Sequence, residues 1–458
     1  MRILIKNASI VHSNTNFVMH IGIENGSIQS INSSVPDEKF DRVIDAEGKF
    51  VFPGGVDPHV HFDLPTPAGS SVDDFKSGSV AALIGGTTSI LDFVTPRRGQ
   101  SMVEALEIRL KEAQGSFVDY SLHVSPVEWR DSTESEIKAC VDAGFPSFKV
   151  YMAYRSNIGL NNEVLFKVLT TVAKYGGMVT VHAEMGDEID LLRDQFLAEG
   201  KSEPLYHLLS RPPGTESEAV RQVIDLAHIA ECPLYIVHVS SEESLIHIAA
   251  AQDRGQVVFA ETCPHYLLLN DTKYNGSFSQ VAPYVISPPL RKVSDNEALW
   301  IALKQGVVQT VGTDHCPFNL SQKMAGEFDF RKIPNGAGGV EHRLTLLYSY
   351  GIQQELITKQ QFIDVTSSNA AQIFGCWPQK GSITVGADAD LVIWDSQKKN
   401  TIQVATHKST SDTEMFEGFE TLGAPEFVIK GGRIVVEKGD LILGNLQKGK
   451  ILRRDIKS

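Results

Sequence analysis

Six residues that can bind metal ions recur along this chain, each close to the end of a short apolar segment. They are His59, His61, Lys149, His182, His238 and Asp314. Imidazole nitrogens and carboxylate oxygens are common ligands of Zn²⁺ and related ions. If the apolar segments are parallel strands of one barrel, their ends meet on one rim and form a single pocket. The pattern therefore predicts one metal centre assembled from distant parts of the chain.

Four of the six are histidines at the ends of predicted strands. His59 and His61 stand two apart in VDPHVH, and the two-residue period of a strand places both side chains on one face. His182 closes MVTVH and His238 closes LYIVH. A single histidine at such a place is more often a hydrogen-bonded core residue, but four at equivalent strand ends favour metal binding.

Lys149 and Asp314 complete the set. Lys149 lies inside the apolar segment SFKVYM, so burial should lower the pKa of its amine. A neutral amine can react with CO₂ to give a carbamate, whose two oxygens could bridge two cations; the alternative is a buried lysine paired with an acid. Asp314 in GTDH can ligate a metal and accept a proton. Two divalent ions, the carbamate, this aspartate and a bridging hydroxide leave a net charge of about +1, which favours ionised water near neutral pH.

A rival zinc site could be drawn from other cysteines and histidines. Its members would be Cys263, His265, Cys316 and His123. Their spacing matches no closed zinc pattern, so packing roles are favoured. His315 follows the predicted aspartate ligand and is expected to support it through hydrogen bonds.

The elements that position these residues are predicted from residues 51–378, where strands and helices alternate. The strand candidates are VFPGGVDPHVH, TTSILDF, DYSLHV, SFKVYM, MVTVHA, LYIVHVS, QVVFAE and VQTVGTD. Capping-box spacing marks helix starts at Ser101, Thr133 and Ser240, and Gly-Gly pairs at 85–86 and 176–177 mark helix ends. Eight strands in this alternation predict a (β/α)₈ TIM barrel, with a doubly wound sheet as the alternative.

The two ends of the chain have a different pattern. Residues 1–50 and 379–458 are predicted to form short strands with Gly, Asn and Asp turns, for example at Asn25-Gly26. We therefore expect one β-sandwich domain built from both termini around the barrel domain of residues 51–378. The basic tail from Lys448 to Lys457 is expected to be solvated or to contact another subunit.

Composition restricts the class of protein. The chain has 458 residues and a formal net charge of -14, which argues against partners such as nucleic acid or an anionic membrane. Five cysteines, odd in number and scattered, fit reduced thiols in a cytosol better than a disulfide framework. The N-terminal segment is too polar for a secretory signal, and no apolar run approaches a membrane span. A cytoplasmic protein is expected.

The chain resembles the cyclic amidohydrolases of the dihydropyrimidinase/hydantoinase family, over nearly its whole length. The resemblance rests on FPGGVDPHVHFD, SFKVYMAYR, VHAE, YIVHVSS, ETCPHYLLL, ISPPLR, VGTDHCPF, IPNGAGGVEHR and GADADLVIWD, in this order. It implies a TIM barrel with a β-sandwich, a homotetramer and two divalent metal ions, most often Zn, with Mn or Co as alternatives. It implies that Lys149 is carboxylated (N6-carboxylysine) and bridges the two ions. The other ligands of one ion would be His59, His61 and Asp314, and those of the second ion would be His182 and His238.

The resemblance also implies the substrate contacts. Tyr154 in KVYMAYR matches the tyrosine that polarises the substrate carbonyl, and Ser287 in ISPPLR and Asn335 in IPNG match positions that hold the cyclic amide. One departure is Met185, which stands where the family usually has Asn after VHAE.

The predicted reaction is metal-dependent hydrolysis of a hydantoin or dihydropyrimidine ring to an N-carbamoyl amino acid, by a bridging hydroxide, with Asp314 passing the proton to the leaving nitrogen. A dihydroorotase is disfavoured because Asp63 occupies the position where that family has Arg. An allantoinase, and a non-catalytic scaffold related to dihydropyrimidinase, remain as alternatives.

Overall fold

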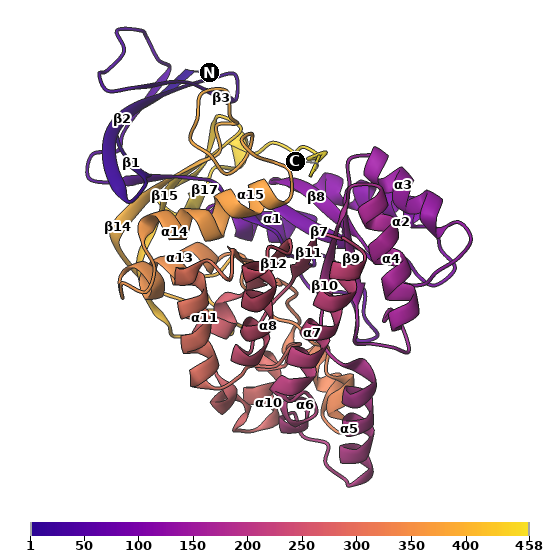
Figure 1. Ribbon diagram of the computed structural model, residues 1–458. Coiled ribbons are helices and arrows are strands. Elements are labelled where there is room, and N and C mark those ends of the chain that lie inside the picture. Colours follow the sequence, from indigo (N-terminus) through magenta and orange to yellow (C-terminus); the bar gives the residue numbers. More distant parts are fainter. Residues whose placement is uncertain (1, 457–458) are drawn as a thin grey trace.

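The computed structural model of the protein describes residues 2–456, which form two sheets and surrounding helices (Figure 1). One sheet has eight parallel strands in the order β13-β12-β11-β10-β9-β8-β7-β6. Its strands are β6 (Gly55–Asp57), β7 (Thr87–Val94), β8 (Asp119–Val124), β9 (Ser147–Tyr151), β10 (Met178–His182), β11 (Leu234–Ile236), β12 (Val258–Thr262) and β13 (Thr310–Val311). The order follows the sequence, as in a (β/α)₈ barrel.

The first and last strands of this sheet meet just beyond their ends. Val60 forms a parallel bridge with His315, and the backbone N–H of His61 donates to the carbonyl of His315 over 2.8 Å. This contact joins the segment after β6 to the segment after β13 and brings the ends of the sheet together. The predicted barrel is confirmed.

Helices connect the barrel strands and cover them on the outside (Figure 1). The longer helices are α1 (Phe75–Ile84), α2 (Met102–Glu112), α3 (Thr133–Asp142), α4 (Asn162–Lys174), α5 (Gly186–Ala198), α7 (Pro213–Ile229), α8 (Glu242–Asp253) and α11 (Val293–Gln305). The shorter ones are α6 (Leu205–Leu209), α9 (Pro264–Leu268), α10 (Phe278–Val281), α12 (Leu320–Lys323), α13 (Arg343–Leu347), α14 (Lys359–Ile363) and α15 (Asn369–Ile373). No helix among the described residues combines the length and apolar character needed to span a membrane.

The predicted helix starts are right to within one residue. Ser101 caps α2, because its hydroxyl accepts from the N–H of Val103. Helix α8 is capped by Ser241 rather than Ser240, whose hydroxyl donates to the buried carboxylate of Glu216 instead. Ser241 also donates to Glu216, so both serines bind this acid and only the second caps the helix.

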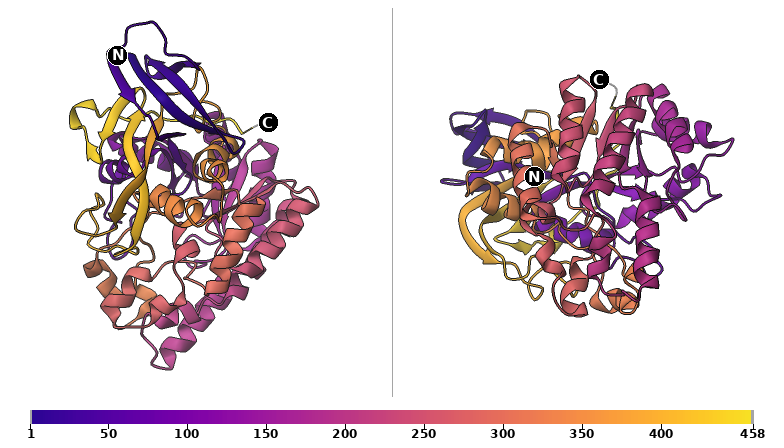
Figure 2. Two further views of the ribbon diagram at one scale, coloured as in Figure 1. Left: turned by 90° about the vertical axis from the view of Figure 1, so that its left-hand side faces the viewer. Right: turned by 60° about the horizontal axis from the view of Figure 1, so that its bottom comes forward.

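Both ends of the chain contribute to the second, mixed sheet. Its nine strands are β1 (Arg2–His12), β2 (Thr15–Glu24), β3 (Ser27–Asn32), β4 (Arg42–Asp45), β5 (Phe50–Pro53), β14 (Leu391–Thr401), β15 (Glu420–Lys430), β16 (Arg433–Glu437) and β17 (Asp440–Leu441). Strand β5 pairs in parallel with β1 and antiparallel with β14, so N-terminal and C-terminal strands lie side by side (Figure 2). The domain boundaries remain predictions. The first of them, between residues 50 and 51, falls within β5, which pairs with strands of both terminal segments.

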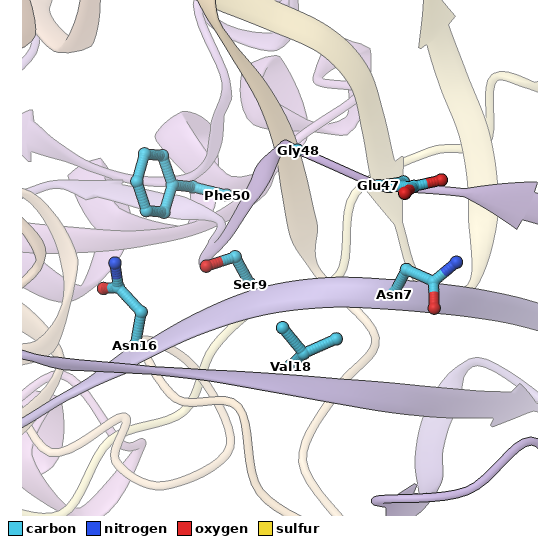
Figure 3. Close-up of a pocket in the computed structure, with 7 residues that line it drawn as sticks. All are labelled: Asn7, Ser9, Asn16, Val18, Glu47, Gly48 and Phe50. Carbon is cyan, nitrogen blue, oxygen red and sulfur yellow. The ribbon is translucent and has the colours of Figure 1, made fainter.

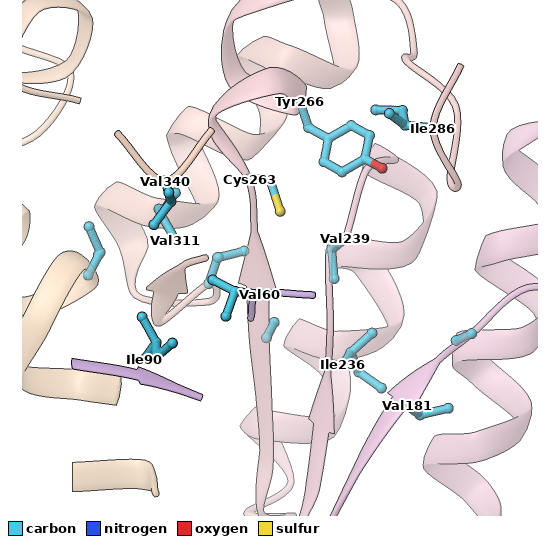
Figure 4. Packing of buried hydrophobic residues seen from close by; sticks show 14 of the residues in the cluster. Val60, Ile90, Val181, Ile236, Val239, Cys263, Tyr266, Ile286, Val311 and Val340 are labelled. Carbon is cyan, nitrogen blue, oxygen red and sulfur yellow. The ribbon is translucent and has the colours of Figure 1, made fainter. Parts of the chain in front are cut away.

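Apolar side chains pack between the barrel strands and the surrounding helices. Val60, Ile90, Val181 and Ile236 point into one packed cluster with almost no exposed surface (Figure 4), which also contains the helix residues Leu165 and Val220. Each fully buried side chain of this size contributes about 1.5–3 kcal/mol relative to exposure. This layer therefore holds the strands firmly beneath the side chains at the rim.

The C-terminal tail differs from the prediction. Ile451 bridges Tyr120 of β8, and the buried guanidinium of Arg454 donates to Ser121 Oγ and Ser147 Oγ, each over 2.7 Å. Arg454 contradicts the expectation of a solvated tail, because its guanidinium pairs with polar groups of β8 and β9, whereas Lys448, Lys450 and Arg453 are exposed as expected. Contact of the tail with another subunit stays a prediction. Lys457 lies outside the described residues.

Candidate metal centre

Three predicted ligands meet where the ends of the barrel sheet come together. Nε2 of His59 lies 3.2 Å from Nε2 of His61, and each of these nitrogens lies 3.1 Å from Oδ1 of Asp314. Ligands about 2.0–2.1 Å from a tetrahedral Zn²⁺ are about 3.3–3.4 Å from one another. The three atoms therefore have nearly the separation that one shared cation would impose.

In the neutral form of His59, the nitrogen that faces Asp314 carries no proton. Oε1 of Glu261, on β12, lies 2.7 Å from Nδ1 of His59, so Nδ1 carries the ring proton and donates it. In the neutral ring Nε2 then presents a lone pair to Oδ1 of Asp314, which can only accept. Burial disfavours a charged ring, but Glu261 and Asp314 together raise the pKa of His59 to about 9. The site attracts positive charge, which a metal ion can supply in place of a proton.

The other two histidines lie beside this triangle. The rings of His182 and His238 are 4.6 Å apart between centroids, and the ring of His238 is 5.5 Å from that of His59. Glu184 lies 2.7 Å from Nε2 of His182 and leaves Nδ1 of that ring free for a metal. Burial lowers the pKa of His182 and of His238, so both rings are neutral and retain a lone pair.

Lys149 is buried at the centre of β9. Its Nζ lies 4.8 Å from the ring centroid of Phe93 and 5.2 Å from that of Tyr151. Burial lowers the pKa of the amine to about 8, although Asp314 and Glu261 act in the opposite direction. Among the described residues Lys149 forms no ion pair, which disfavours the alternative of a structural salt bridge.

Three of the predicted residues have a left-handed backbone. The φ angles are 42° at His238, 49° at Asp314 and 58° at Tyr154. Such conformations cost about 1–3 kcal/mol in residues other than glycine and cluster at functional sites. At His238 the backbone N–H is held by Glu261 over 3.3 Å. The fold thus stabilises an unfavourable backbone at the positions where side chains must turn toward the rim.

The ring of His315 bonds Asp73 and the backbone of Gly339 rather than Asp314, so its support of the centre stays a prediction. The N–H of Gly339 donates to Nδ1 over 3.0 Å, so the ring proton is on Nε2, which donates to Asp73 over 3.0 Å. Ser409 and the backbone of Thr410 also donate to Asp73. The residue after Asp314 is therefore anchored on both sides of its ring.

The residues implied for substrate binding fall into two places. The ring of Tyr154 lies 5.4 Å from that of His182. Asn335 Nδ2 donates to Ser287 Oγ over 3.0 Å, so these two residues from different loops are in direct contact. Their roles remain predictions.

The two loops that carry Ser287 and Asn335 are joined by a buried lysine. Nζ of Lys323 donates to the carbonyls of Val285, Pro334 and Gly336 over 2.8–3.0 Å. Sequence reasoning missed this residue, because an isolated lysine at the end of a short helix carries no sign of burial.

Sequence reasoning also missed Glu261 and Glu184, which hold the rings of two predicted ligands. Glu261 closes the apolar segment VVFAE, the same signal that identified the histidines, so it could have been found. The rival cysteine and histidine site is not among the groups that could hold a metal in the described part of the chain. His123, one of its members, instead bonds Ser147 and the carbonyl of Pro58.

A surface pocket of about 360 Å³ lies elsewhere, in the terminal sheet (Figure 3). It is lined by Asn7, Ser9, Asn16, Val18, Glu47, Gly48 and Phe50. None of the predicted site residues contributes to it, and its lining offers no cluster of metal ligands.

Comparisons with known proteins show the family of the chain. Residues 50–435 match the amidohydrolase family. The chain is 41% identical to a D-hydantoinase of Ralstonia pickettii over 99% of both chains, and 38% identical to a dihydropyrimidinase of Rattus norvegicus over 96% of this chain and 86% of that one. The crystal structure of a dihydropyrimidinase from Brevibacillus agri superposes with a TM-score of 0.97, at 39% identity and with full coverage of both chains. The chain therefore belongs to the amidohydrolase family, among the cyclic amidohydrolases that include the hydantoinases and dihydropyrimidinases.

Proposed function

We propose that this enzyme opens hydantoin or dihydropyrimidine rings at a centre of two divalent metal ions and releases N-carbamoyl amino acids. The observation that carries the proposal is the convergence of His59 Nε2, His61 Nε2 and Asp314 Oδ1 within 3.2 Å of one another. The names of the relatives, D-hydantoinase and dihydropyrimidinase, support the substrate class.

The donor groups fit two cations. One would be held by the triangle of His59, His61 and Asp314, and the other by His182 and His238, with a carboxylated Lys149 between them. Nδ1 of His61 is buried without a hydrogen-bond partner, a sign that this ring is placed for something other than hydrogen bonding. Zn²⁺ suits imidazole and carboxylate donors, and Mn²⁺ or Co²⁺ would also fit. Two such ions would polarise the ring carbonyl and ionise the attacking water near neutral pH.

The residues around the ions would do the rest of the chemistry. Asp314, whose side chain is 19% exposed, is the predicted ligand most open to a substrate, and its carboxylate can take a proton and return it to the leaving nitrogen. Tyr154 would donate its hydroxyl to the substrate carbonyl oxygen as negative charge develops there. Ser287 and Asn335, already bonded to one another, would orient the cyclic amide.

The neutral amine of Lys149 would take up CO₂ before the metals bind. Attack of the neutral amine on CO₂ forms an N–C bond, and loss of one proton leaves a carbamate whose two oxygens share one negative charge. Burial between the rings of Phe93 and Tyr151 lowers the pKa of the amine to about 8, so a larger fraction is neutral near pH 7 than in an ordinary lysine. The carbamate would then replace an unfavourable positive charge by a negative one.

The test is a substrate panel together with metal analysis. Dihydrouracil, hydantoin and 5-substituted D- and L-hydantoins are expected to be hydrolysed, and allantoin and dihydroorotate much more slowly. Two metals per chain are expected by elemental analysis. Preference for dihydroorotate would overturn the substrate class, and absence of metal and activity after incubation with Zn²⁺ and bicarbonate would favour a non-catalytic scaffold. We further propose that the protein is cytoplasmic and forms a homotetramer. Light scattering at several concentrations would test the oligomeric state.

A further inference from the structure

We propose that His342, His407 and Glu414 bind a further divalent cation of the Zn²⁺ class, separate from the predicted metal centre, that fastens residues 402–419 onto the barrel. His342 directly precedes α13 of the barrel. The other two residues belong to the crossover segment, defined as residues 402–419, which connects β14 to β15. One ligand atom from each of the three residues lies within 4.8 Å of the others.

The hydrogen bonds of His407 point to a missing positive charge. Nε2 of His407 lies 2.9 Å from the carbonyl oxygen of Ser411, which can only accept, so Nε2 carries the ring proton. In the neutral ring Nδ1 then has a lone pair, and this lone pair lies 3.3 Å from Oε2 of Glu414. Two acceptors face each other there unless a proton or a metal ion lies between them. A ring nitrogen that ligates a metal usually belongs to a histidine whose other nitrogen donates to a carbonyl.

His342 supplies an independent sign. Its Nε2 is buried, lies 3.3 Å from the same oxygen of Glu414, and has no hydrogen-bond partner. The side chains of His407 and Glu414 are each only 4% exposed, so little water can compensate. Both nitrogen-to-oxygen separations equal the distance of about 3.3 Å expected between ligands of one tetrahedral Zn²⁺.

The donor set selects the kind of cation. Two imidazoles and one carboxylate suit Zn²⁺, whereas Ca²⁺ and Mg²⁺ prefer sites made of oxygen alone. Protons are the competing occupant. Burial opposes a charge on His407 and on His342, but Glu414 raises the pKa of both rings. A site that would otherwise hold protons between two imidazoles and a carboxylate is one in which a dication can replace them.

The position of the site gives it a structural role. The crossover segment reaches from the terminal sheet to the barrel, where Ser409 and Thr410 donate to Asp73, and Asp73 holds His315. His407 and Glu414 lie on either side of these two contacts in the sequence. A cation shared with His342 would therefore fix both flanks of the segment that reaches Asp73.

The test uses the Zn²⁺-loaded full-length enzyme. Anomalous diffraction at the zinc edge is expected to give a peak between the three side chains, and the metal content of His342→Gln and Glu414→Gln is expected to be one equivalent below that of the wild type. His228→Gln, which changes an exposed helical histidine, serves as the control and should match the wild type. Because the readout is a difference, it does not depend on whether the predicted metal centre holds two ions, one or none.

The role in fastening is tested by proteolysis. Zn²⁺ is expected to slow cleavage inside residues 402–419 about tenfold in the wild type and to have no such effect in Glu414→Gln. The absence of an anomalous peak at the three side chains, or equal metal content in all four proteins, would overturn the site. Binding without protection would overturn its fastening role.

Discussion

The carboxylate of Glu261 holds Nδ1 of His59 at 2.7 Å, on the ring nitrogen opposite the one that faces Asp314. This contact fixes which nitrogen carries the proton and therefore which one is free for a metal. The other oxygen of Glu261 accepts from the hydroxyl of Tyr235 over 2.8 Å, so the carboxylate itself cannot turn away. The orientation of His59 at the rim therefore depends on Glu261, which is not itself a predicted metal ligand.

Replacing Glu261 by Gln should weaken metal binding about 10–100-fold, because the amide is neutral and no longer holds the ring proton of His59 as firmly. Metal titration of the chelated protein, followed by activity, would measure the loss. Tyr235→Phe is the matched control, since it removes a hydrogen bond to Glu261 but keeps the carboxylate, and a smaller loss is expected. Equal affinity in Glu261→Gln and the wild type would contradict the role.

Asp314→Asn should lower kcat about 10²–10⁴-fold while the protein stays folded, because the amide cannot accept the proton. Asn also tolerates the left-handed backbone found at this position, where φ is 49°. The substitution therefore separates chemistry from backbone strain. Circular dichroism and steady-state kinetics would check both, and substantial turnover in the variant would eliminate the proton-transfer role.

Lys149 gives a pH prediction for reactivation. With a pKa of about 8, the fraction of neutral amine rises about tenfold between pH 7 and pH 9, whereas an ordinary lysine gains about a hundredfold. The rate of activation of the metal-free enzyme by Zn²⁺ at constant dissolved CO₂ should follow the smaller increase. A hundredfold increase would mean that the burial of Lys149 does not lower its pKa.

Lys323→Met should raise KM more than it lowers kcat, because Lys323 joins the loops that carry Ser287 and Asn335. Three buried carbonyls would lose their donor, and we expect a stability loss of about 2–5 kcal/mol. Steady-state kinetics and urea unfolding would measure the two effects. Lys304→Met, on an exposed face of α11, is the control. An unchanged KM would show that the loops do not need this connection.

Lys380→Met should destabilise the contact between the barrel and the terminal sheet. Nζ of Lys380 pairs with the buried carboxylates of Asp119 and Asp390 and with the partly buried carboxylate of Asp388, a cluster that would otherwise resemble a cation site. Loss of the lysine removes an ion pair from each carboxylate, although Asp119 keeps Lys430, and we expect a cost of about 3–5 kcal/mol. Lys111→Met, on the surface of α2, should have almost no effect.

The loss in Lys380→Met should depend on pH. Burial opposes ionisation of Asp119, but Lys380 and Lys430 lower the pKa of its carboxyl below the ordinary value. Wild-type stability from this group is therefore present above about pH 4 and lost as pH falls through the lowered pKa. In the variant the carboxyls can be protonated at a smaller cost, so the stability difference should shrink from pH 7 toward pH 4.5. If the stability difference between the wild type and Lys380→Met stayed constant with pH, loss of charge pairing would not be its cause.

Much of this arrangement could be predicted from the sequence because strand ends carry their own signal. Lys149 and His182 stand on strands that the apolar pattern identified, and the order of the strands brought them near His59 and Asp314. The left-handed backbone at Asp314 could not be predicted, because it arises from tertiary contacts rather than from a local preference.

Other features were beyond sequence reasoning for the same reason. The triad of His342, His407 and Glu414 joins loops far apart in the chain, with no period or strand to connect them. The C-terminal tail is basic and looks solvated in sequence, but Arg454 finds buried acceptors that only the folded barrel provides.

Because β5 pairs with both β1 and β14, the terminal sheet cannot be completed until late in synthesis of the chain. The ribosome releases the first strands early, yet β14 begins only at Leu391, after the whole barrel has been made. Until then the edge of β5 that pairs with β14 is unpaired. The apolar residues of the terminal sheet, among them Ile3, Ile5 and Ile21, lack the C-terminal strands that help to bury them. We therefore expect the nascent N-terminal segment to expose apolar surface until the last strands have been synthesised.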